Sequence, residues 1–218
     1  MLSNKTDYIQ YSKNNYHLLE NIHNQYPETI LFACENVKTE GNRQYSLNQF
    51  ENAINYYLLG ICFYRYYSPQ TDKVITEKKI NIKNENLKIQ TTEMIKVLFL
   101  NLAACYLKTA EYVNAINACM EVLNLDEDNP KALYRISKAL LGRNDADLND
   151  IKQAIVFLEK AERLAPNDSN IQNILEKAND SYIHKQIILN KIESPELRDI
   201  YQFIKNDIHE NFDIIEKF

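Results

Sequence analysis

The stretch LNLAACYLKTAEYVNAINACMEVLNLD, residues 100–126, decides the fold of this chain. Its small residues Ala103 and Ala115 stand 12 positions apart, each within a segment whose apolar side chains follow the helical period. Apolar side chains spaced three and four residues apart lie on one face of a helix. Small side chains let two helices approach closely, so the stretch predicts a hairpin of two packed helices.

Two further segments repeat this arrangement, one before it at residues 34–66 and one after it at residues 130–166. Three positions match among the repeats, and small residues are typical of them. In the first helix the position holds Gly41, Ala103 and Ser137, and in the second helix it holds Ala53, Ala115 and Ala154. Seven residues further on stand Gly60, Val122 and Ala161. The gaps between hairpins are expected to be filled by large side chains, namely Phe50, Tyr57, Tyr112, Leu133 and Phe157. One hairpin cannot bury its apolar face alone, so the three are expected to stack.

The spacing of these positions identifies the repeat. Ala103 and Ser137 are 34 residues apart, which is the period of tetratricopeptide repeats. The third segment is five residues longer between its two helices, in the polar stretch 144–149. About 28 extra residues separate the first segment from the second, and they form the insert 67–95. Its Lys- and Asn-rich part, residues 68–92, is expected to contain a mobile stretch.

The predicted fold is all-α, at least two-thirds helix, with no sheet. Its three hairpins (residues 34–66, 96–126 and 130–166) are expected to form a short right-handed superhelix. Residues 1–33 are expected to be an N-terminal helical extension whose role stays open. Residues 167–193 are expected to cap the array, with apolar positions at Ile171, Ile174, Leu175, Ala178, Tyr182 and Ile183.

The last predicted element is an amphipathic helix at residues 194–218, beginning near Pro195. Its apolar stripe consists of Leu197, Tyr201, Ile204, Ile208, Phe212 and Ile215. Two interpretations of this helix stay open. The stripe either packs back on the array or forms a surface for self-association or for another partner.

Composition and charge exclude several classes of function. A net charge of −5 disfavours nucleic acid as the main partner, because phosphates attract a basic surface. The sequence has no apolar run near 18 residues and no apolar stretch at its polar start, which predicts neither a membrane span nor a signal peptide. With only 3 Gly, it also has no Gly-rich phosphate loop. We therefore expect a cytoplasmic protein.

The residue types that carry chemistry are scattered. The four cysteines form no Cys-x-x-Cys pair and are expected to be buried and reduced. Cys105 has no histidine beside it in the pattern, which disfavours a nucleophile. The four histidines are His17, His23, His184 and His209, and none has a second ligand at metal spacing. We expect no catalytic residue, metal or cofactor, and hence no enzyme activity within the chain.

Binding chemistry gathers instead on the first helix of each repeat. Lys38 and Asn42 are four residues apart and share a face, as do Lys131 and Arg135 in the third repeat. Asn101 lies on the corresponding helix of the second repeat. Cationic groups bind carboxylates through charge-assisted hydrogen bonds, and asparagine amides donate to carboxylates or to peptide backbone. The set suits a peptide that ends in carboxylates.

The stretches Lys38-Thr-Glu-Gly-Asn42, Leu100-Asn101-Leu-Ala-Ala-Cys105 and Lys131-Ala-Leu-Tyr-Arg135 resemble the carboxylate clamp of co-chaperone tetratricopeptide domains. The resemblance covers residues 34–185. It implies binding of the Glu-Glu-Val-Asp tail shared by heat shock protein 90 and cytosolic heat shock protein 70, through Lys38, Asn42, Asn101, Lys131 and Arg135. Tyr45 matches a groove position that places a ring near the peptide in some members.

The long insert resembles the immunophilin branch of the family, the FKBP-type isomerases and their relatives. The frequent aromatic residue near the start of each repeat is missing from the first two, and the closing proline is present only as Pro166. The strand-rich isomerase domain is not in this sequence, so the chain either never had one or is a fragment, and the initial Met favours a complete N-terminus. Two alternatives to an adaptor stay open: the non-catalytic region of such an isomerase, or a scaffold for an unrelated partner.

Overall fold

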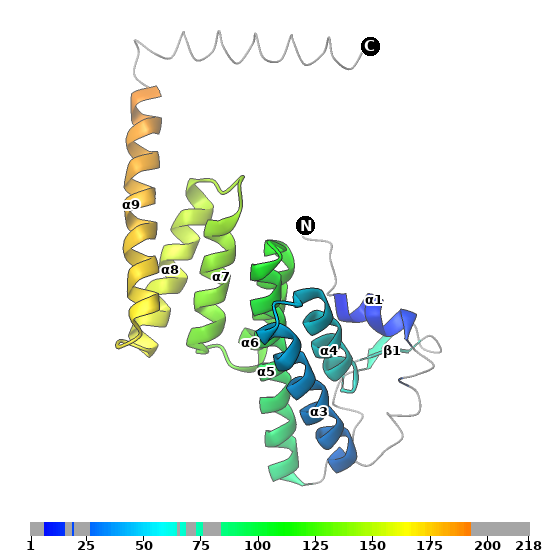
Figure 1. The fold of residues 1–218 in the computed structure, drawn as a ribbon. Coiled ribbons are helices and arrows are strands. Elements are labelled where there is room, and N and C mark those ends of the chain that lie inside the picture. The colour runs from blue at the N-terminus through cyan, green and yellow to red at the C-terminus, as the bar shows by residue number, and fades with distance from the viewer. Residues whose placement is uncertain are drawn as a thin grey trace, which may run out of the picture.

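The computed structural model describes residues 7–15, 19, 27–64, 66–68, 73–75 and 84–192. Helices dominate this part of the chain (Figure 1). They are α1 (Asp7–Asn14), α3 (Pro27–Ser46), α4 (Phe50–Cys62), α5 (Glu85–Lys108), α6 (Tyr112–Leu125), α7 (Pro130–Gly142), α8 (Leu148–Leu164) and α9 (Ser169–Ile192). The all-α fold predicted from the sequence is confirmed.

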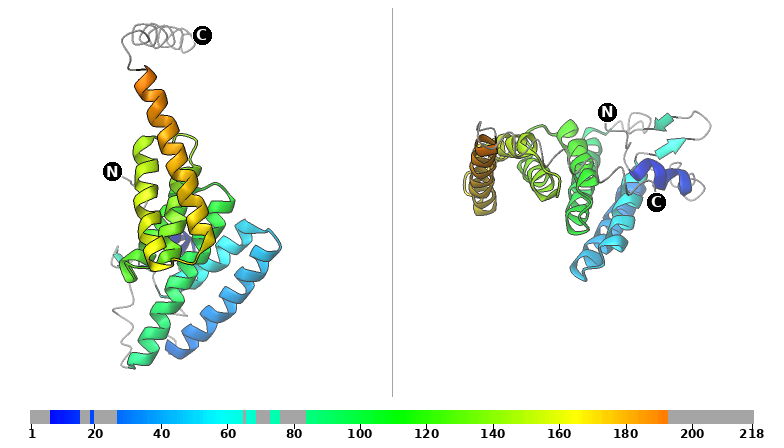
Figure 2. Two further views of the ribbon diagram at one scale, coloured as in Figure 1. Left: turned by 90° about the vertical axis from the view of Figure 1, so that its left-hand side faces the viewer. Right: turned by 90° about the horizontal axis from the view of Figure 1, so that it is seen from above.

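From α3 to α9, each helix packs on the next in chain order. The pairs α3–α4, α5–α6 and α7–α8 are the three predicted hairpins, and α9 packs against α8 at the end of the row (Figure 2). The first helices of successive hairpins also touch, because α3 contacts α5 and α5 contacts α7. Residues on these three helices are therefore brought to one side of the stack.

The small residues of the repeat lie in the core, as predicted. Ala53, Ala103, Ala115 and Ala154 have no exposed surface, and Ser137 is equally buried. The Ser137 hydroxyl lies 3.0 Å from the Leu133 carbonyl oxygen and 3.1 Å from that of Ala154, so it has acceptors on both helices of its hairpin. Of the expected gap-filling side chains, Tyr57 and Leu133 are buried in the core, and Tyr112 and Phe157 are half-buried against it. Phe50 is half-buried and packs on the Tyr45 ring instead.

Two helices begin earlier than the sequence predicted. Asn84 caps α5, its Oδ1 accepting from the backbone N–H groups of Asn86 at 3.0 Å and Leu87 at 3.4 Å. The first helix of the second repeat thus starts at Glu85 rather than near Lys96. Likewise α3 starts at Pro27, before the predicted repeat boundary at Cys34, with the proline in the first turn where its missing N–H costs nothing.

The insert contains a short β-hairpin, so the expectation of no sheet was wrong at this place. Strand β1 (Tyr66–Ser68) pairs antiparallel with β2 (Lys73–Ile75), with Tyr66 opposite Ile75 and Ser68 opposite Lys73. Aromatic and β-branched residues favour strands, which accounts for this local structure. Residues 84–92 of the insert belong to α5 and its cap, whereas residues 69–72 and 76–83 lie outside the described part.

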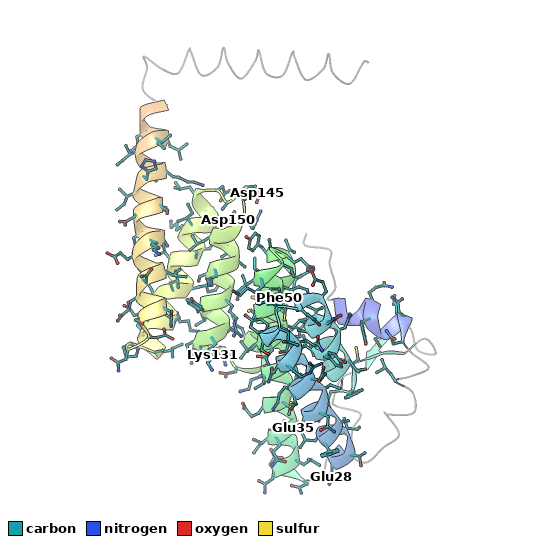
Figure 3. All side chains as sticks on the ribbon, in the orientation of Figure 1. Glu28, Glu35, Phe50, Lys131, Asp145 and Asp150 are labelled. Carbon is teal, nitrogen blue, oxygen red and sulfur yellow. The ribbon has the colours of Figure 1, made fainter. Side chains whose placement is uncertain are left out.

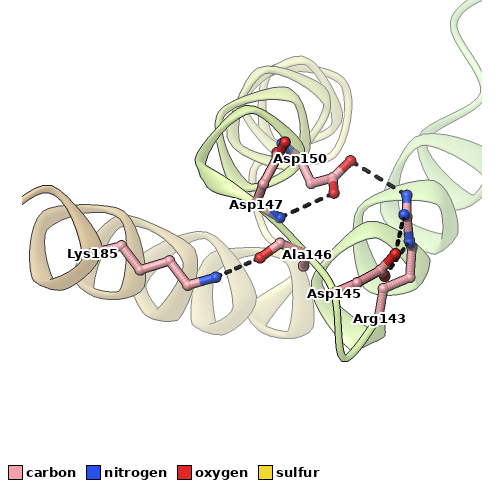
Figure 4. Close-up of polar contacts among 6 residues, drawn as sticks. All are labelled: Arg143, Asp145, Ala146, Asp147, Asp150 and Lys185. Carbon is pink, nitrogen blue, oxygen red and sulfur yellow. Dashed lines mark hydrogen bonds and ion pairs between the residues drawn. The ribbon is translucent and has the colours of Figure 1, made fainter. Parts of the chain in front are cut away.

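The longer turn of the third repeat is closed by polar contacts (Figure 4). Arg143 bridges Asp145 at 2.9 Å and Asp150 at 3.5 Å. Asp147 and Asp150 form a capping box at the start of α8, each accepting from the other's backbone N–H. Lys185 of α9 donates to the Ala146 carbonyl oxygen. The extra residues are therefore held against α8 and α9.

The capping helix α9 fits its prediction at most positions. Ile171 and Ala178 are buried, and Ile174, Leu175 and Tyr182 are half-buried, whereas Ile183 is 56% exposed and does not join the core. The predicted final helix at residues 194–218 lies outside the described residues. Of the predicted N-terminal extension, α1 and the first part of α3 are described, whereas residues 1–6, 16–18 and 20–26 are not. Among the helices that the structure describes, none combines the length and apolar character that a membrane span requires.

Candidate functional site

The candidate binding residues lie on α3, α5 and α7, the three first helices. In Figure 3, Glu35 marks the α3 side of this region and Lys131 the beginning of α7. Lys38, Asn42 and Tyr45 belong to α3, Asn101 belongs to α5, and Lys131 and Arg135 belong to α7. Because α5 contacts both α3 and α7, its residue Asn101 lies between the other two groups.

Asn42 and Asn101 are joined directly. The Asn101 Nδ2 donates to the Asn42 Oδ1 at 3.0 Å, across 59 residues of sequence. The same Oδ1 accepts from the Tyr57 hydroxyl at 2.8 Å. With two donors on Oδ1, the Asn42 amide is oriented so that its NH₂ group remains available to a ligand. Asn42 is exposed on the surface of α3.

Arg135 ties the third repeat to the same place. Its Nη1 donates to the Leu100 carbonyl oxygen at 2.8 Å, next to Asn101 in the chain. The side chain is half-buried, and this bond holds it against α5. A guanidinium group has five N–H donors, so this bond leaves others for a carboxylate.

The two lysines are placed differently. The Lys38 Nζ lies 2.5 Å from Glu35 Oε2, one turn earlier on α3, and only 23% of the Lys38 side chain is exposed. Lys131 is exposed at the start of α7, and within the described residues it has no hydrogen bond or ion pair. The structure therefore joins Asn42, Asn101 and Arg135 through contacts between helices, while Lys38 and Lys131 lie on the same helices without a bond to that cluster.

Tyr45 stands near the end of α3 and is half-buried. Its ring meets that of Phe50 edge-on, with centroids 5.3 Å apart and an angle of 65° between the planes. Phe50 begins α4, so this contact closes the turn between the two helices. Tyr45 thus has a packing role in the described structure, besides the groove position expected for it.

A groove between α3 and the early part of α5 was missed by the sequence analysis. It encloses about 610 Å³ and its lining includes Phe32, Glu35, Lys38, Ile89 and Val97. Phe32 is 68% exposed and Ile89 53%. The groove exists because both helices begin early, and the Asn84 cap followed by an apolar helical period was the signal that could have revealed it.

The buried cysteines offer no reactive thiol. Burial is the largest cause that raises the pKa of Cys34, Cys62, Cys105 and Cys119, in each case to about 12. A nucleophilic cysteine needs the opposite shift, because the thiolate is the reactive form. Within the described residues, no group of three or more His, Cys, Asp or Glu side chains is arranged to hold a metal ion.

The family model of the tetratricopeptide repeat matches residues 131–168. These residues include nearly all of α7, the whole of α8 and the turn that leads to α9. The matched segment coincides with the third repeat found in the sequence.

Two curated relatives show the extent of the likeness. Protein unc-45 homolog B of Xenopus tropicalis is 31% identical over 176 residues, which are 75% of this chain and 16% of that protein. The peptidyl-prolyl cis-trans isomerase FKBP42 of Arabidopsis thaliana is 29% identical over 154 residues, which are 68% of this chain and 36% of that protein. The chain therefore spans well under half the length of either relative.

Solved structures give a similar picture. The C-terminal TPR-containing domain of a Plasmodium falciparum FK506-binding protein superposes with a TM-score of 0.61 at 25% identity, covering 76% of this chain and 98% of that domain. The Hsp90 co-chaperone Cns1 of Saccharomyces cerevisiae superposes with a TM-score of 0.55 at 23% identity, covering 84% of this chain and 48% of that one. At that identity, the likeness to Cns1 concerns the fold alone.

Proposed function

We propose that this chain is a co-chaperone adaptor, starting from its tetratricopeptide repeats and from its similarity to protein unc-45 homolog B, to FKBP42 and to the C-terminal domain of the Plasmodium falciparum FK506-binding protein. The ligand of this chain is the C-terminal Glu-Glu-Val-Asp tail of heat shock protein 90 or of cytosolic heat shock protein 70. The site consists of Lys38, Asn42, Tyr45, Asn101, Lys131 and Arg135. The adaptor acts in the cytoplasm, where these chaperones are.

The observation that carries the proposal is a pair of hydrogen bonds between the first helices. Asn101 donates to Asn42, and Arg135 donates to the backbone carbonyl oxygen of Leu100, the residue before Asn101. These bonds link donors from three successive repeats that are far apart in sequence. The Asn42 amide and the remaining Arg135 N–H groups are directed donors, and Lys38 and Lys131 add positive charge on the flanking helices. Such a set suits a chain end that presents several carboxylates close together.

Charge-assisted hydrogen bonds supply most of the binding energy in this proposal. Each contributes roughly 1.5–3 kcal/mol when the partner group is charged. A short peptide that gains a few of them, after the cost of ordering its backbone, binds with a dissociation constant on the order of micromolar. Salt weakens such binding in part, because the exposed Lys131 is screened while the half-buried Lys38 and Arg135 are screened less.

The decisive experiment is a calorimetric titration with a peptide ending Glu-Glu-Val-Asp. The free-acid peptide binds, and the same peptide with an amidated C-terminus binds roughly ten- to a hundredfold more weakly. Lys38→Ala and Arg135→Ala each cause a loss of that size, while the folded state persists by circular dichroism. Lys177→Ala, an exposed lysine on α9, serves as the control and leaves the affinity unchanged.

Two outcomes contradict the proposal. One is no binding of the free-acid peptide at millimolar concentration. The other is equal binding of the free-acid and amidated peptides. Either result leaves a repeat scaffold that serves a different partner.

A second candidate function has its own support. The likeness to FKBP42 and to the C-terminal domain of the Plasmodium falciparum FK506-binding protein favours a chain that is the non-catalytic repeat region of an FKBP-type isomerase. An isomerase assay on the full natural gene product tests it. Activity there, together with peptide binding by residues 1–218, assigns both roles, whereas an inactive full product contradicts this second candidate.

A further inference from the structure

The Tyr57 side chain is buried between the two helices of the first repeat. It belongs to α4 and is only 1% exposed. Its ring lies against α3 at Gly41, where a Cβ atom would come within 2.6 Å of the ring's Cε1. Only a residue without a side chain allows this approach, so the position of the Tyr57 ring depends on the glycine at position 41. The approach brings the Tyr57 hydroxyl to Asn42, the next residue along α3.

The hydroxyl donates to the Asn42 Oδ1 at 2.8 Å and is also in hydrogen-bonding contact with the Asn101 side chain. Burial is the largest cause that raises the pKa of Tyr57, so the group stays protonated and able to donate throughout the neutral range. Asn101 donates to the same oxygen at 3.0 Å. A side-chain amide whose oxygen faces two donors cannot reverse without placing its NH₂ group against them.

We propose that Tyr57 is a positioning residue for peptide binding, which acts by holding the Asn42 amide with its NH₂ group toward the ligand. This inference rests on the proposed function and adds to it a residue that does not itself touch the peptide. Preorganised donors improve affinity because the ligand does not have to pay for ordering them.

The chain offers a matched control for this idea. In the third repeat, Gly142 at the end of α7 faces the ring of Tyr112, and a Cβ there would also come within 2.6 Å of the ring's Cε1. Tyr112 thus packs on a helix glycine as Tyr57 does, but it begins α6 and lies beside Arg143 and Asp145 in the longer turn of the third repeat. Replacing each tyrosine by phenylalanine keeps the ring and removes one hydroxyl.

The first test needs no peptide. Tyr57→Phe shifts the side-chain NH₂ resonances of Asn42 and Asn101 in a ¹⁵N correlation spectrum, because the shared oxygen loses one donor. Tyr112→Phe leaves both pairs of resonances in place. Unchanged Asn42 resonances in Tyr57→Phe would overturn the inference, whatever the peptide does.

The second test measures affinity for the free-acid Glu-Glu-Val-Asp peptide. Tyr57→Phe weakens binding about three- to tenfold, the worth of one neutral hydrogen bond, while Tyr112→Phe has no effect. In an Asn42→Ala background, Tyr57→Phe has no further effect, because the group through which it acts is gone. A purely structural role would give the same loss in both backgrounds, and that result would overturn the inference.

The two tests separate failure of the inference from failure of the proposed function. If the wild-type chain does not bind the peptide, the proposed function is contradicted and the binding role of Tyr57 is contradicted with it, even where the resonances shift. If the wild-type chain binds and Tyr57→Phe binds equally well, the positioning role alone is contradicted.

Discussion

The Lys38 ammonium group lies 2.5 Å from a carboxylate oxygen of Glu35, one helical turn earlier on α3. Lys38 is one of the cations proposed to bind the peptide, so its charge is already matched by a carboxylate of the same helix. A peptide carboxylate must compete with Glu35 for this lysine and is also repelled by the Glu35 charge. Glu35 therefore works against the ligand that the site is proposed to bind.

Removing that competitor is expected to strengthen peptide binding. Glu35→Gln leaves the side chain nearly the same size and removes its charge. Exposed ion pairs are worth only a fraction of a kcal/mol to about 1 kcal/mol, so the gain in affinity is about two- to fivefold, measured by calorimetry at low salt. Glu159→Gln on the outer helix α8 is the control and changes little. Weaker or equal binding by Glu35→Gln would contradict the competition.

Arg135 is expected to need its planar, branched group as well as its charge. It donates to the Leu100 carbonyl oxygen at 2.8 Å and has to reach the peptide with its remaining N–H groups. Arg135→Lys keeps the charge but has one compact donor group for both tasks. We expect roughly tenfold weaker peptide binding with little change in the urea midpoint. Arg163→Lys on α8 is the matched control, and full affinity in Arg135→Lys would show that charge alone is sufficient.

Gly41 is expected to be sensitive to the smallest enlargement. A Cβ atom at this position would meet the buried, rigid ring of Tyr57 at 2.6 Å. Overpacking a core costs about 1–3 kcal/mol, of which the better helix propensity of alanine returns up to about 1 kcal/mol. Gly41→Ala should therefore lower the free energy of unfolding measured in urea, and it should weaken peptide binding by displacing Tyr57.

Gly142→Ala is the comparison for that prediction. It creates an equally short contact with Tyr112, but Tyr112 is half-buried and has room to move. The loss of stability is expected to be smaller, and peptide affinity is expected to stay the same. A Gly41→Ala chain as stable as the wild type would contradict the close packing of α3 on α4.

The four buried thiols predict how stability depends on alkaline pH. Their pKa values in the folded chain are raised to about 12, whereas an unfolded thiol ionises near pH 8.5. The folded state therefore holds these protons more tightly. Its advantage is complete below about pH 8.5 and is lost as the pH rises from there toward 12, because the unfolded chain ionises first.

Two measurements check this prediction. The urea midpoint, in the presence of a reductant, should fall steadily from pH 8 to pH 10.5. A thiol-specific chromogenic reagent at pH 8 should react slowly with the native chain and with all four cysteines once the chain is unfolded. Rapid labelling of the native chain would show that at least one thiol is accessible.

The hairpins were predictable because tight helix packing requires small residues at matching places. Gly41, Ala103 and Ser137 are all buried where that pattern required it. The start of α5 was not predictable in the same way. Its first turns contain Asn86, Thr91 and Thr92, which have weak helix propensity, and the contact of α5 with α3 stabilises them as helix. Tertiary packing overrode local preference at this place.

The candidate site was predictable to the level of helices and faces. A spacing of four residues places Lys38 beside Asn42 and Lys131 beside Arg135 on one side of a helix. The spacing alone does not predict the bond of Arg135 to Leu100 or the pairing of Lys38 with Glu35. Those contacts depend on rotamers and on the distance between helices, which emerge only when the repeats pack together.

The longer turn of the third repeat lies at the end of α7 opposite Lys131, as the labelled positions of Asp145 and Lys131 show (Figure 3). The additional residues are held there by Arg143, by the capping box of α8 and by Lys185. The buried small residues of this repeat keep the positions in the core that they have in the other repeats. Evolution can therefore lengthen such a repeat at this end of α7 while the end that carries the proposed site keeps its geometry. The same end is a sensible place for a protein engineer to insert an epitope or a reporter peptide.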